Sequence, residues 1–281
     1  MTIRGGKRVP QLPEGGPRIR RVGVVVPTAD AKQPMTQACV EAVHRTTRGF
    51  EVDLQLVESG GPDFRFSRSV NQGMRASKDA DAWVLLNDDA VMDAGWLDAL
   101  VGTAHAHPHV GLVGAVLRYP DGGLQHAGGY LPLSPVEYVT ASVRHRAPFW
   151  ALRRIRANAW KSDFYMFGHW HSVWGMHRLD FLTAACVLIT RPCRERVGDY
   201  DEEYIFGCED VDYSLRALDQ GFELALATRA TGVHHESRTA GGSLHLKGEP
   251  TFRSKWTPEH VRRLTRTLRI GRGVHSDATG V

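Results

Sequence analysis

Residues 82–89 read AWVLLNDD, and this stretch decides the fold class. Five apolar residues in a row, bounded by polar ones, are typical of a strand buried on both faces of a sheet. Two adjacent carboxylates, Asp88 and Asp89, follow the strand almost at once. In open α/β sheets, ligands bind beyond the carboxyl ends of the strands. The stretch therefore favours an α/β fold with a polar site at this strand end.

The segments on either side alternate between strand and helix patterns. Strands are expected at 22–26, 52–57, 110–116, 181–190 and 222–227, and helices at 34–48, 66–77, 94–106 and 209–220. This alternation predicts a mainly parallel sheet with helices on both faces. Residues 117–180 are rich in glycine, aromatic residues and histidine, so we expect hairpins and loops there, with a short helix around 149–160. An amphipathic helix is expected from 258 to about 270.

Length and composition fit one large globular domain with a tail. The chain has 281 residues, of which 42% are hydrophobic and 23% charged, which leaves enough apolar side chain for a sizeable core. We expect a flexible leader at 1–19, a domain at 20–242 and a basic tail at 243–281. The formal net charge of +4 suits anionic ligands and selects none of them.

Cysteine spacing and hydropathy bear on the compartment. The four cysteines form no CxxC pair, which favours buried free thiols in a reducing environment. No apolar run approaches the roughly 20 residues of a membrane span, and the first residues lack the apolar core of a signal peptide. We expect a cytoplasmic protein, at most attached to a membrane surface. The arginines of the tail (Arg262, Arg263, Arg266, Arg269 and Arg272) suit a membrane surface or another polyanion, or else a solvated helix packed on the domain.

Three constellations could carry chemistry. Asp88 and Asp89 repel unless a cation such as Mg²⁺ or Mn²⁺ lies between them, although aspartates also cap helices. Residues 209–216 (EDVDYSLR) begin a helix, where acidic side chains suit the dipole, and Asp210 could instead be a general base. His234 and His235 could complete a metal shell or be structural, and the sequence does not say which of the two would bind.

Order and context make these signals specific. The pieces are 22–30, 56–59 (LVES), 66–73 (FSRSVNQG), 85–89 (LLNDD), 121–128 (DGGLQHAG), 182–189 leading into 197–202, and 209–216, followed by His234. Together they resemble the GT-A-fold family 2 glycosyltransferases, in particular the bacterial branch with rhamnosyltransferase-like enzymes, over residues 20 to 240. The family segments are G-F-x-x-x-x-N-x-G, an acidic D-x-D type motif, D-G-x-x-Q-H-x-G and E-D-x-D-x-x-x-R.

The resemblance implies a GT-A domain whose residues 20–116 bind the nucleotide and whose residues 117–242 form the acceptor part. It implies an inverting, metal-dependent transfer from a nucleoside-diphosphate sugar. Asp89 and His234 are the implied ligands of Mn²⁺ or Mg²⁺, and Asp210 is the implied base beside Glu209. The implied donor contacts are Thr28, Asp30, Glu58, Arg68, Asn71 and Asp88.

The chain departs from the family pattern at three places. Glu58 replaces the usual aspartate, Asn87 occupies the first acidic position, and Ala184 and Ala185 stand where glycine is common. The long segment from 131 to 179 is idiosyncratic, and such loops often carry acceptor choice. His171 and Trp174 within it are candidate acceptor contacts, with loop packing as the alternative.

The sequence leaves the donor and acceptor open. The nucleotide base, the sugar and an acceptor that is a glycan, lipid-linked, a small molecule or a nucleic acid all remain compatible with the residues. A nucleotidyltransferase is a second interpretation, but it usually carries a glycine-rich basic loop after the first strand, where this chain has Pro27 and Thr28. A non-catalytic nucleotide-sugar or nucleic-acid-binding module is a third, against which the complete acidic set argues.

Overall fold

The computed structural model describes residues 3–4, 7–8, 18–61, 64–129, 131, 179–235 and 247–268. The helix expected around 149–160 and the candidates His171 and Trp174 lie outside these ranges. Near the start of the chain, β1 (Ile3–Arg4) and β2 (Lys7–Arg8) pair antiparallel.

The centre of the molecule is one sheet, which is eight-stranded within the described ranges. Its order is β4 (Glu51–Glu58), β3 (Arg21–Thr28), β5 (Ala82–Leu86), β9 (Cys186–Thr190), β7 (Val110–Arg118), β10 (Glu223–His234) and β6 (Ala90–Met92), and β8 (Leu124–His126) pairs with β7. The pairings β3–β4, β3–β5 and β7–β10 are parallel. Strand β9 lies antiparallel to both of its neighbours, β5 and β7. The five strands β4, β3, β5, β7 and β10 therefore all run in one direction.

The sheet is therefore mainly parallel, as predicted. Three of its strands, β6, β8 and β9, run in the opposite direction. Two predicted strands have different bounds from those expected. The strand expected at 181–190 is limited to Cys186–Thr190, and the one expected at 222–227 continues to His234. Its continuation follows an irregularity between Ala227 and Thr231, after which β10 pairs with both β7 and β6.

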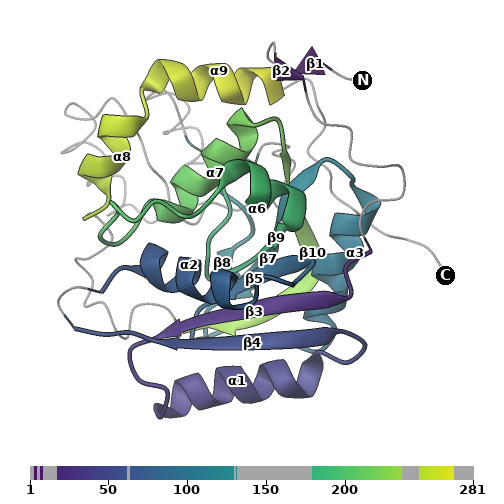
Figure 1. Cartoon of the computed structure of the whole chain (residues 1–281). Helices are drawn as coiled ribbons and strands as arrows, with labels where there is room; N and C mark the ends of the chain where they lie inside the picture. Colours follow the sequence, from purple (N-terminus) through teal and green to yellow (C-terminus); the bar gives the residue numbers. More distant parts are fainter. Residues whose placement is uncertain are drawn as a thin grey trace.

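Helices cover both faces of the sheet (Figure 1). On one face lie α1 (Pro34–Thr46) and α3 (Trp96–Ala106), whose apolar side chains pack with Val22, Val24 and Val26 of β3. On the other face lie α2 (Phe66–Ala76), α6 (Arg191–Val197) and α7 (Glu209–Asp219), which pack with Val25 of the same strand. Successive side chains of a strand point to opposite faces, so the valine run supplies both cores.

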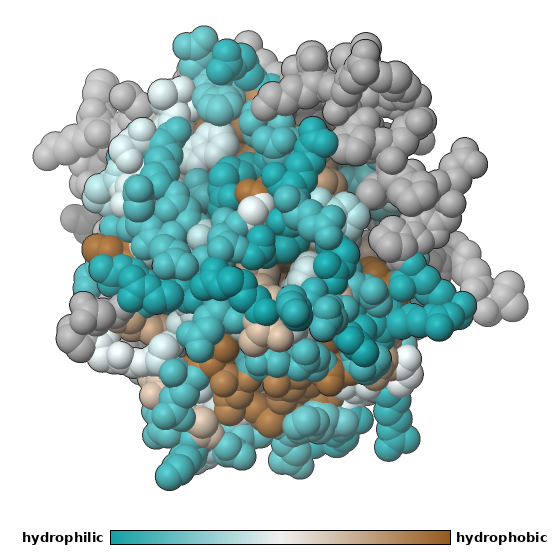
Figure 2. Space-filling view, in the orientation of Figure 1, coloured by the Kyte–Doolittle hydropathy of each residue, from teal (hydrophilic) through white to brown (hydrophobic). Residues whose placement is uncertain are grey.

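Helix α2 lies close to β3 because Gly73 has no side chain. A Cβ at this position would stand 2.3 Å from Cγ1 of Val25. At the outer edge of the sheet, β4 keeps Val52, Leu54 and Leu56 only partly buried. The hydrophobic strip low in Figure 2 lies where Figure 1 shows β4 and α1, on a face that is otherwise mainly hydrophilic.

The C-terminal segment packs on the same core as α7. Phe252 of α8 (Glu249–Lys255), Trp256 and Val261 of α9 (Pro258–Leu268) are all buried in it. For the described residues this agrees with a helix packed on the domain, one of the two interpretations of the tail. All four cysteines are buried and free, as expected. In the described part of the chain, no helix has the length and apolarity needed to cross a bilayer.

Candidate active site

The carboxyl ends of β3 and β5 bring Thr28 and Asp88 together. The hydroxyl of Thr28 donates to Oδ2 of Asp88 at 2.6 Å, and Thr36 of α1 donates to the same oxygen at 3.3 Å. Both threonines are buried. Burial raises the pKa of Asp88, the charge of Asp89 raises it further, and the two hydroxyl hydrogen bonds oppose this rise. Asp88 is thus held rigidly at the strand end.

Asp30 and Glu58 lie at the same edge of the sheet. The backbone N–H of Asp30 donates to the hydroxyl oxygen of Thr28 at 3.2 Å. Oε2 of Glu58, at the end of β4, accepts a hydrogen bond from the backbone N–H of Ala31 at 3.0 Å. Both acidic side chains belong to exposed residues, so their carboxylates remain accessible to a ligand. Four of the predicted donor contacts therefore share one strand-end surface.

Asp89 and His234 are brought together by the pairing of β6 with β10. Ala90, the residue after Asp89, is the register partner of His234. Nε2 of His234 lies 3.1 Å from Oδ1 of Asp89 and 3.2 Å from Nδ2 of Asn87. The backbone N–H of His235 donates to the carbonyl of Asp89 at 3.0 Å. The ring that faces the carboxylate is that of His234.

Gln125 fixes the orientation of the His234 ring. Its Nε2 donates to the carbonyl of His234 at 3.2 Å, so its Oε1 is the acceptor that lies 2.7 Å from Nδ1 of the ring. Nδ1 consequently carries a proton, and Nε2 is the ring nitrogen that faces Asn87 and Asp89. Metal-binding histidines are oriented in this way, by a second hydrogen bond from the other ring nitrogen.

The chemistry of this pair fits a divalent cation. A lone pair on Nε2 and a carboxylate oxygen at 3.1 Å repel each other unless a proton or a cation lies between them. Within the described ranges, no group of three or more His, Cys, Asp or Glu side chains could hold a metal. Asp89 and His234 would supply two ligand atoms to such a cation, and substrate phosphates and water often complete magnesium sites of this kind.

The start of α7 carries Asp210 into the same region. Gly207 and Cys208, just before the helix, both have left-handed backbone, with φ of 83° and 71°. Such a value is uncommon outside glycine and marks a sharp turn held by its surroundings. Oδ2 of Asp210 accepts a hydrogen bond from the backbone N–H of Ala184 at 3.4 Å.

The segment Ala184–Ala185 links Asp210 to Asn87 and His234. The backbone N–H of Asn87 donates to the carbonyl of Ala185 at 3.0 Å, next to the Ala184 that contacts Asp210. Asn87 in turn contacts His234. Asp210 thus contacts Ala184 directly, and the Asp89–His234 pair is linked to the adjoining Ala185 through Asn87.

Glu209 is buried beside Asp210. Its residue is 8% exposed, and its Oε2 has no hydrogen-bond partner among the described residues. Burial, followed by the charge of Asp210, raises the pKa of Glu209 well above that of an ordinary carboxyl. A raised pKa makes Glu209 the proton-carrying member of the pair.

Asn71 and Arg68 of α2 contact the loop that precedes α7. The amide of Asn71 is fully buried, donates to the carbonyl of Tyr200 at 2.8 Å and accepts from its N–H at 2.8 Å. Nε of Arg68 lies 3.5 Å from Oε2 of Glu202, and the arginine side chain is mostly exposed. Direct contact of these two residues with a donor stays a prediction. The contacts themselves give Asn71 the task of holding the loop.

Several residues of the site had no assigned role in the sequence analysis. They are Thr36, Asn87, Gln125, Lys255 and Trp256. Usable signals existed for Gln125, which lies in the segment at 121–128, and for Asn87, which lies in the segment at 85–89. The other three act through contacts between elements that are distant in sequence, and local patterns do not reveal such contacts.

Comparisons with known proteins identify the family and the fold of the chain. The model of the family described as "Glycosyltransferase like family 2" matches residues 17–257. Among solved structures, that of GalNAc-T7 with UDP, GalNAc and Mn²⁺ superposes with a TM-score of 0.56 at 13% identity, covering 90% of this chain and 55% of that one. At this identity the likeness concerns the fold, which is that of the GT-A glycosyltransferases.

Two curated bacterial relatives are similar over part of the chain. The O-antigen biosynthesis protein RfbC of Myxococcus xanthus is 35% identical over 165 residues, which are 58% of this chain and 12% of that protein. The N-acetylglucosaminyl-diphospho-decaprenol L-rhamnosyltransferase of Mycobacterium tuberculosis is 26% identical over 169 residues, 57% of this chain and 49% of that one. The chain thus matches half or less of each relative's length.

Proposed function

The chain belongs to the glycosyltransferase-like family 2, and on that premise we propose that it transfers a sugar from a nucleoside-diphosphate donor to an acceptor hydroxyl in one inverting displacement. The observation that carries the proposal is the chain of contacts that runs from Asp210 through Ala184, Ala185 and Asn87 to the pair His234 and Asp89. A pair of cation ligands then lies next to a carboxylate that can take a proton.

The donor half of the site is the strand-end surface with Thr28, Asp30, Glu58 and Asp88. We assign the nucleoside to this surface because its carboxylates can accept hydrogen bonds from ribose hydroxyls and base N–H groups. When bound, a divalent cation at Asp89 and His234 would neutralise charge on the leaving diphosphate. Support for such a cation comes from the oriented ring of His234, whose Nε2 faces Asp89, and from the presence of Mn²⁺ in the GalNAc-T7 structure.

Asp210 is the proposed general base. It would accept the proton of the acceptor hydroxyl as that oxygen attacks the anomeric carbon from the side opposite the leaving phosphate. Glu209, with its raised pKa, keeps its proton at neutral pH and leaves the negative charge on its neighbour. Holding base, hydroxyl and donor in line would contribute several kcal/mol through positioning alone.

The names of the relatives narrow the substrate class. One relative is named for O-antigen biosynthesis and another for rhamnosyl transfer to a lipid-linked diphospho-sugar. We propose that the acceptor is a growing surface glycan or its lipid-linked precursor. This supports a place at the cytoplasmic face of a membrane, where a basic C-terminal segment could approach anionic lipid.

The test replaces Asp210 by asparagine in the full chain. A thermal-shift screen of UDP-, GDP- and dTDP-sugars with Mn²⁺ first identifies the donor, and release of its nucleoside diphosphate then measures turnover. Asp210→Asn should lower turnover by about 100-fold or more, since general-base catalysis contributes roughly that much. Nucleoside-diphosphate affinity should not change in calorimetry.

The matched control is Asp98→Asn. Asp98 is also an aspartate in the first turn of a helix, but it is exposed on α3, on the opposite face of the sheet. The control should keep the full rate. Wild-type turnover in the Asp210→Asn variant would show that this carboxylate is not the base.

A further inference from the structure

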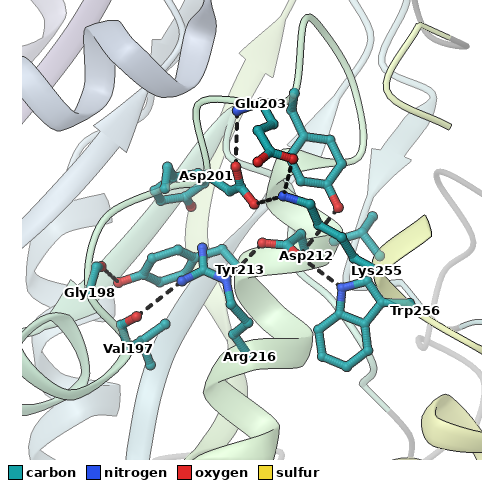
Figure 3. A network of polar contacts seen from close by, with 12 residues as sticks. Val197, Gly198, Asp201, Glu203, Asp212, Tyr213, Arg216, Lys255 and Trp256 are labelled. Atoms are coloured by element: carbon teal, nitrogen blue, oxygen red, sulfur yellow. Dashed lines mark hydrogen bonds and ion pairs between the residues drawn. The ribbon is translucent and has the colours of Figure 1, made fainter. Parts of the chain in front are cut away.

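The buried carboxylate of Asp212 joins α7 to the C-terminal segment (Figure 3). Asp212 is 2% exposed and accepts hydrogen bonds from Nε1 of Trp256 at 2.8 Å, from Nε of Arg216 at 2.8 Å and from the hydroxyl of Tyr204 at 3.3 Å. Trp256 follows α8 directly and lies 44 residues beyond Asp212 in the chain. A distant segment thus completes the hydrogen bonding of a residue two positions after Asp210.

Lys255 holds the loop that leads into α7. Its ammonium group pairs with Asp201 and lies 2.8 Å from Oε2 of Glu203, and Figure 3 shows it between the two carboxylates. The lysine and Asp201 are both only about a quarter exposed, so solvent screens this pair less than a surface pair. Without the charge of Lys255, the carboxylates of Asp201 and Glu203 would repel each other on a loop that also carries Asp199 and Glu202.

Backbone packing reinforces the same contact. Gly248, at the start of the C-terminal segment, lies so close to the carbonyl of Gly207 that a Cβ at position 248 would overlap it. Gly207 opens the left-handed turn that precedes Glu209 and Asp210. The C-terminal segment therefore contacts the loop and the first turn of α7 at three points, through Gly248, Lys255 and Trp256.

The position of Asp210 depends on this frame. Its Oδ2 accepts a long hydrogen bond from the backbone N–H of Ala184 at 3.4 Å, and its Oδ1 accepts one of 2.8 Å from the backbone N–H of Val211, within the same helical turn. The carboxylate is therefore tied to the first turn of α7, whose placement depends on the loop and on Asp212. A misplacement of about 1 Å in a reacting group can cost roughly 100-fold in rate.

We propose that Lys255 and Trp256 are positioning residues, which hold the 199–207 loop and the first turn of α7 so that Asp210 stays in place for proton transfer. This inference rests on the proposed function for its kinetic consequence, while its structural part stands on the contacts alone. It makes the C-terminal segment a working part of the active site.

Two variants of the full chain test the contacts without deleting the segment. Trp256→Phe keeps an aromatic ring and removes the N–H donor to Asp212, and Lys255→Met keeps the length of the side chain and removes its charge. Lys255→Arg restores the charge and should recover most of the effect. The matched control is Ser254→Ala, at the exposed residue next to Lys255 in the same helix. The hydroxyl of Ser254 donates to the backbone carbonyl of Thr251.

Hydrogen–deuterium exchange provides a readout that needs no substrate. In both test variants, amides of 200–212 should exchange about tenfold faster than in the wild type, whereas amides of α1 and all amides of the control keep their rates. Wild-type exchange at 200–212 in both variants would overturn the proposal. This readout keeps its meaning even if Asp210→Asn turns over normally and the base assignment fails.

The kinetic readout separates positioning from general loss of structure. In Trp256→Phe and Lys255→Met, kcat for nucleoside-diphosphate release should fall about 10- to 100-fold with unchanged affinity for the nucleoside diphosphate and Mn²⁺. A wild-type kcat in both variants would overturn the proposal. So would a parallel fall of kcat, nucleotide affinity and melting temperature, because that pattern reports damage to the whole fold.

Discussion

Replacing Glu209 by glutamine should make the protein more stable at alkaline pH relative to the wild type. Glu209 is buried, one of its carboxylate oxygens lacks a hydrogen-bond partner among the described residues, and its immediate neighbour is Asp210. These surroundings penalise the ionised carboxylate and raise the pKa of Glu209 from 4.5 to about 8. Glutamine keeps the shape of the side chain and cannot ionise.

The sign follows from proton binding. Between pH 4.5 and about 8 the folded state holds a proton on Glu209 that the unfolded state has lost, so the free energy of unfolding falls as the pH rises through this window. Each pKa unit is worth about 1.4 kcal/mol, which sets a ceiling of about 5 kcal/mol. Structural relaxation and water penetration reduce such penalties, and we expect about 2 kcal/mol.

The assay is urea unfolding of wild type and Glu209→Gln at pH 5, 7 and 9. Groups remote from Glu209 titrate alike in the two proteins, so the difference in unfolding free energy isolates Glu209 together with its coupling to Asp210. That difference should move by about 2 kcal/mol in favour of the variant from pH 5 to pH 9. The control Glu41→Gln, at an exposed site on α1, should show a flat difference. A flat difference for Glu209→Gln as well would refute the reasoning.

Two further predictions concern the cation and the packing of the sheet. Asp89→Ala or His234→Ala should remove the gain in nucleoside-diphosphate affinity that Mn²⁺ confers on the wild type, measured by calorimetry with Mn²⁺ and with EDTA; a variant that keeps the gain contradicts the ligand assignment. Gly73→Ala should lower the unfolding free energy by about 1–3 kcal/mol because its Cβ would meet Val25 at 2.3 Å. Gly102→Ala, in a helix with nothing within 4 Å of the new Cβ, should raise it by about 0.5–1 kcal/mol, and equal effects of the two changes would count against the packing argument.

The α/β core was predictable because its signals are local. The apolar run at 82–86 is a fully buried strand, and the acidic pair lies at its carboxyl end, where parallel sheets bind ligands. The direction of each strand in the sheet was harder to predict from the sequence. Strand β9 looks like any other buried run, and its antiparallel placement between β5 and β7 is set by pairing with strands that are distant in the sequence.

The neighbourhood of His234 could be predicted only by resemblance, not from the residues alone. Residues 228–232 read TRATG, which does not continue a strand pattern. The pairing of β10 with β7 shifts register between Ala227 and Thr231, and β10 continues beyond this shift. Strand β6 has three residues, too few for a periodicity signal. Yet the pairing of these two segments is what sets His234 beside Asp89. Long-range pairing between weak strands leaves no trace in the local sequence.

The two aspartates of the segment 209–212 have opposite tasks, and helix geometry explains why. Residues two positions apart on a helix point about 200° away from each other, so Asp210 and Asp212 cannot serve one site. Asp212 faces Arg216 and Trp256 inside the protein, whereas Asp210 accepts a hydrogen bond from the backbone of Ala184. Asp212→Asn puts an amide donor among groups that donate hydrogen bonds and should cost about 3 kcal/mol in urea unfolding. Asp210→Asn should lose turnover at nearly unchanged stability, and the reverse pattern would mean that the chemistry depends on the buried carboxylate instead.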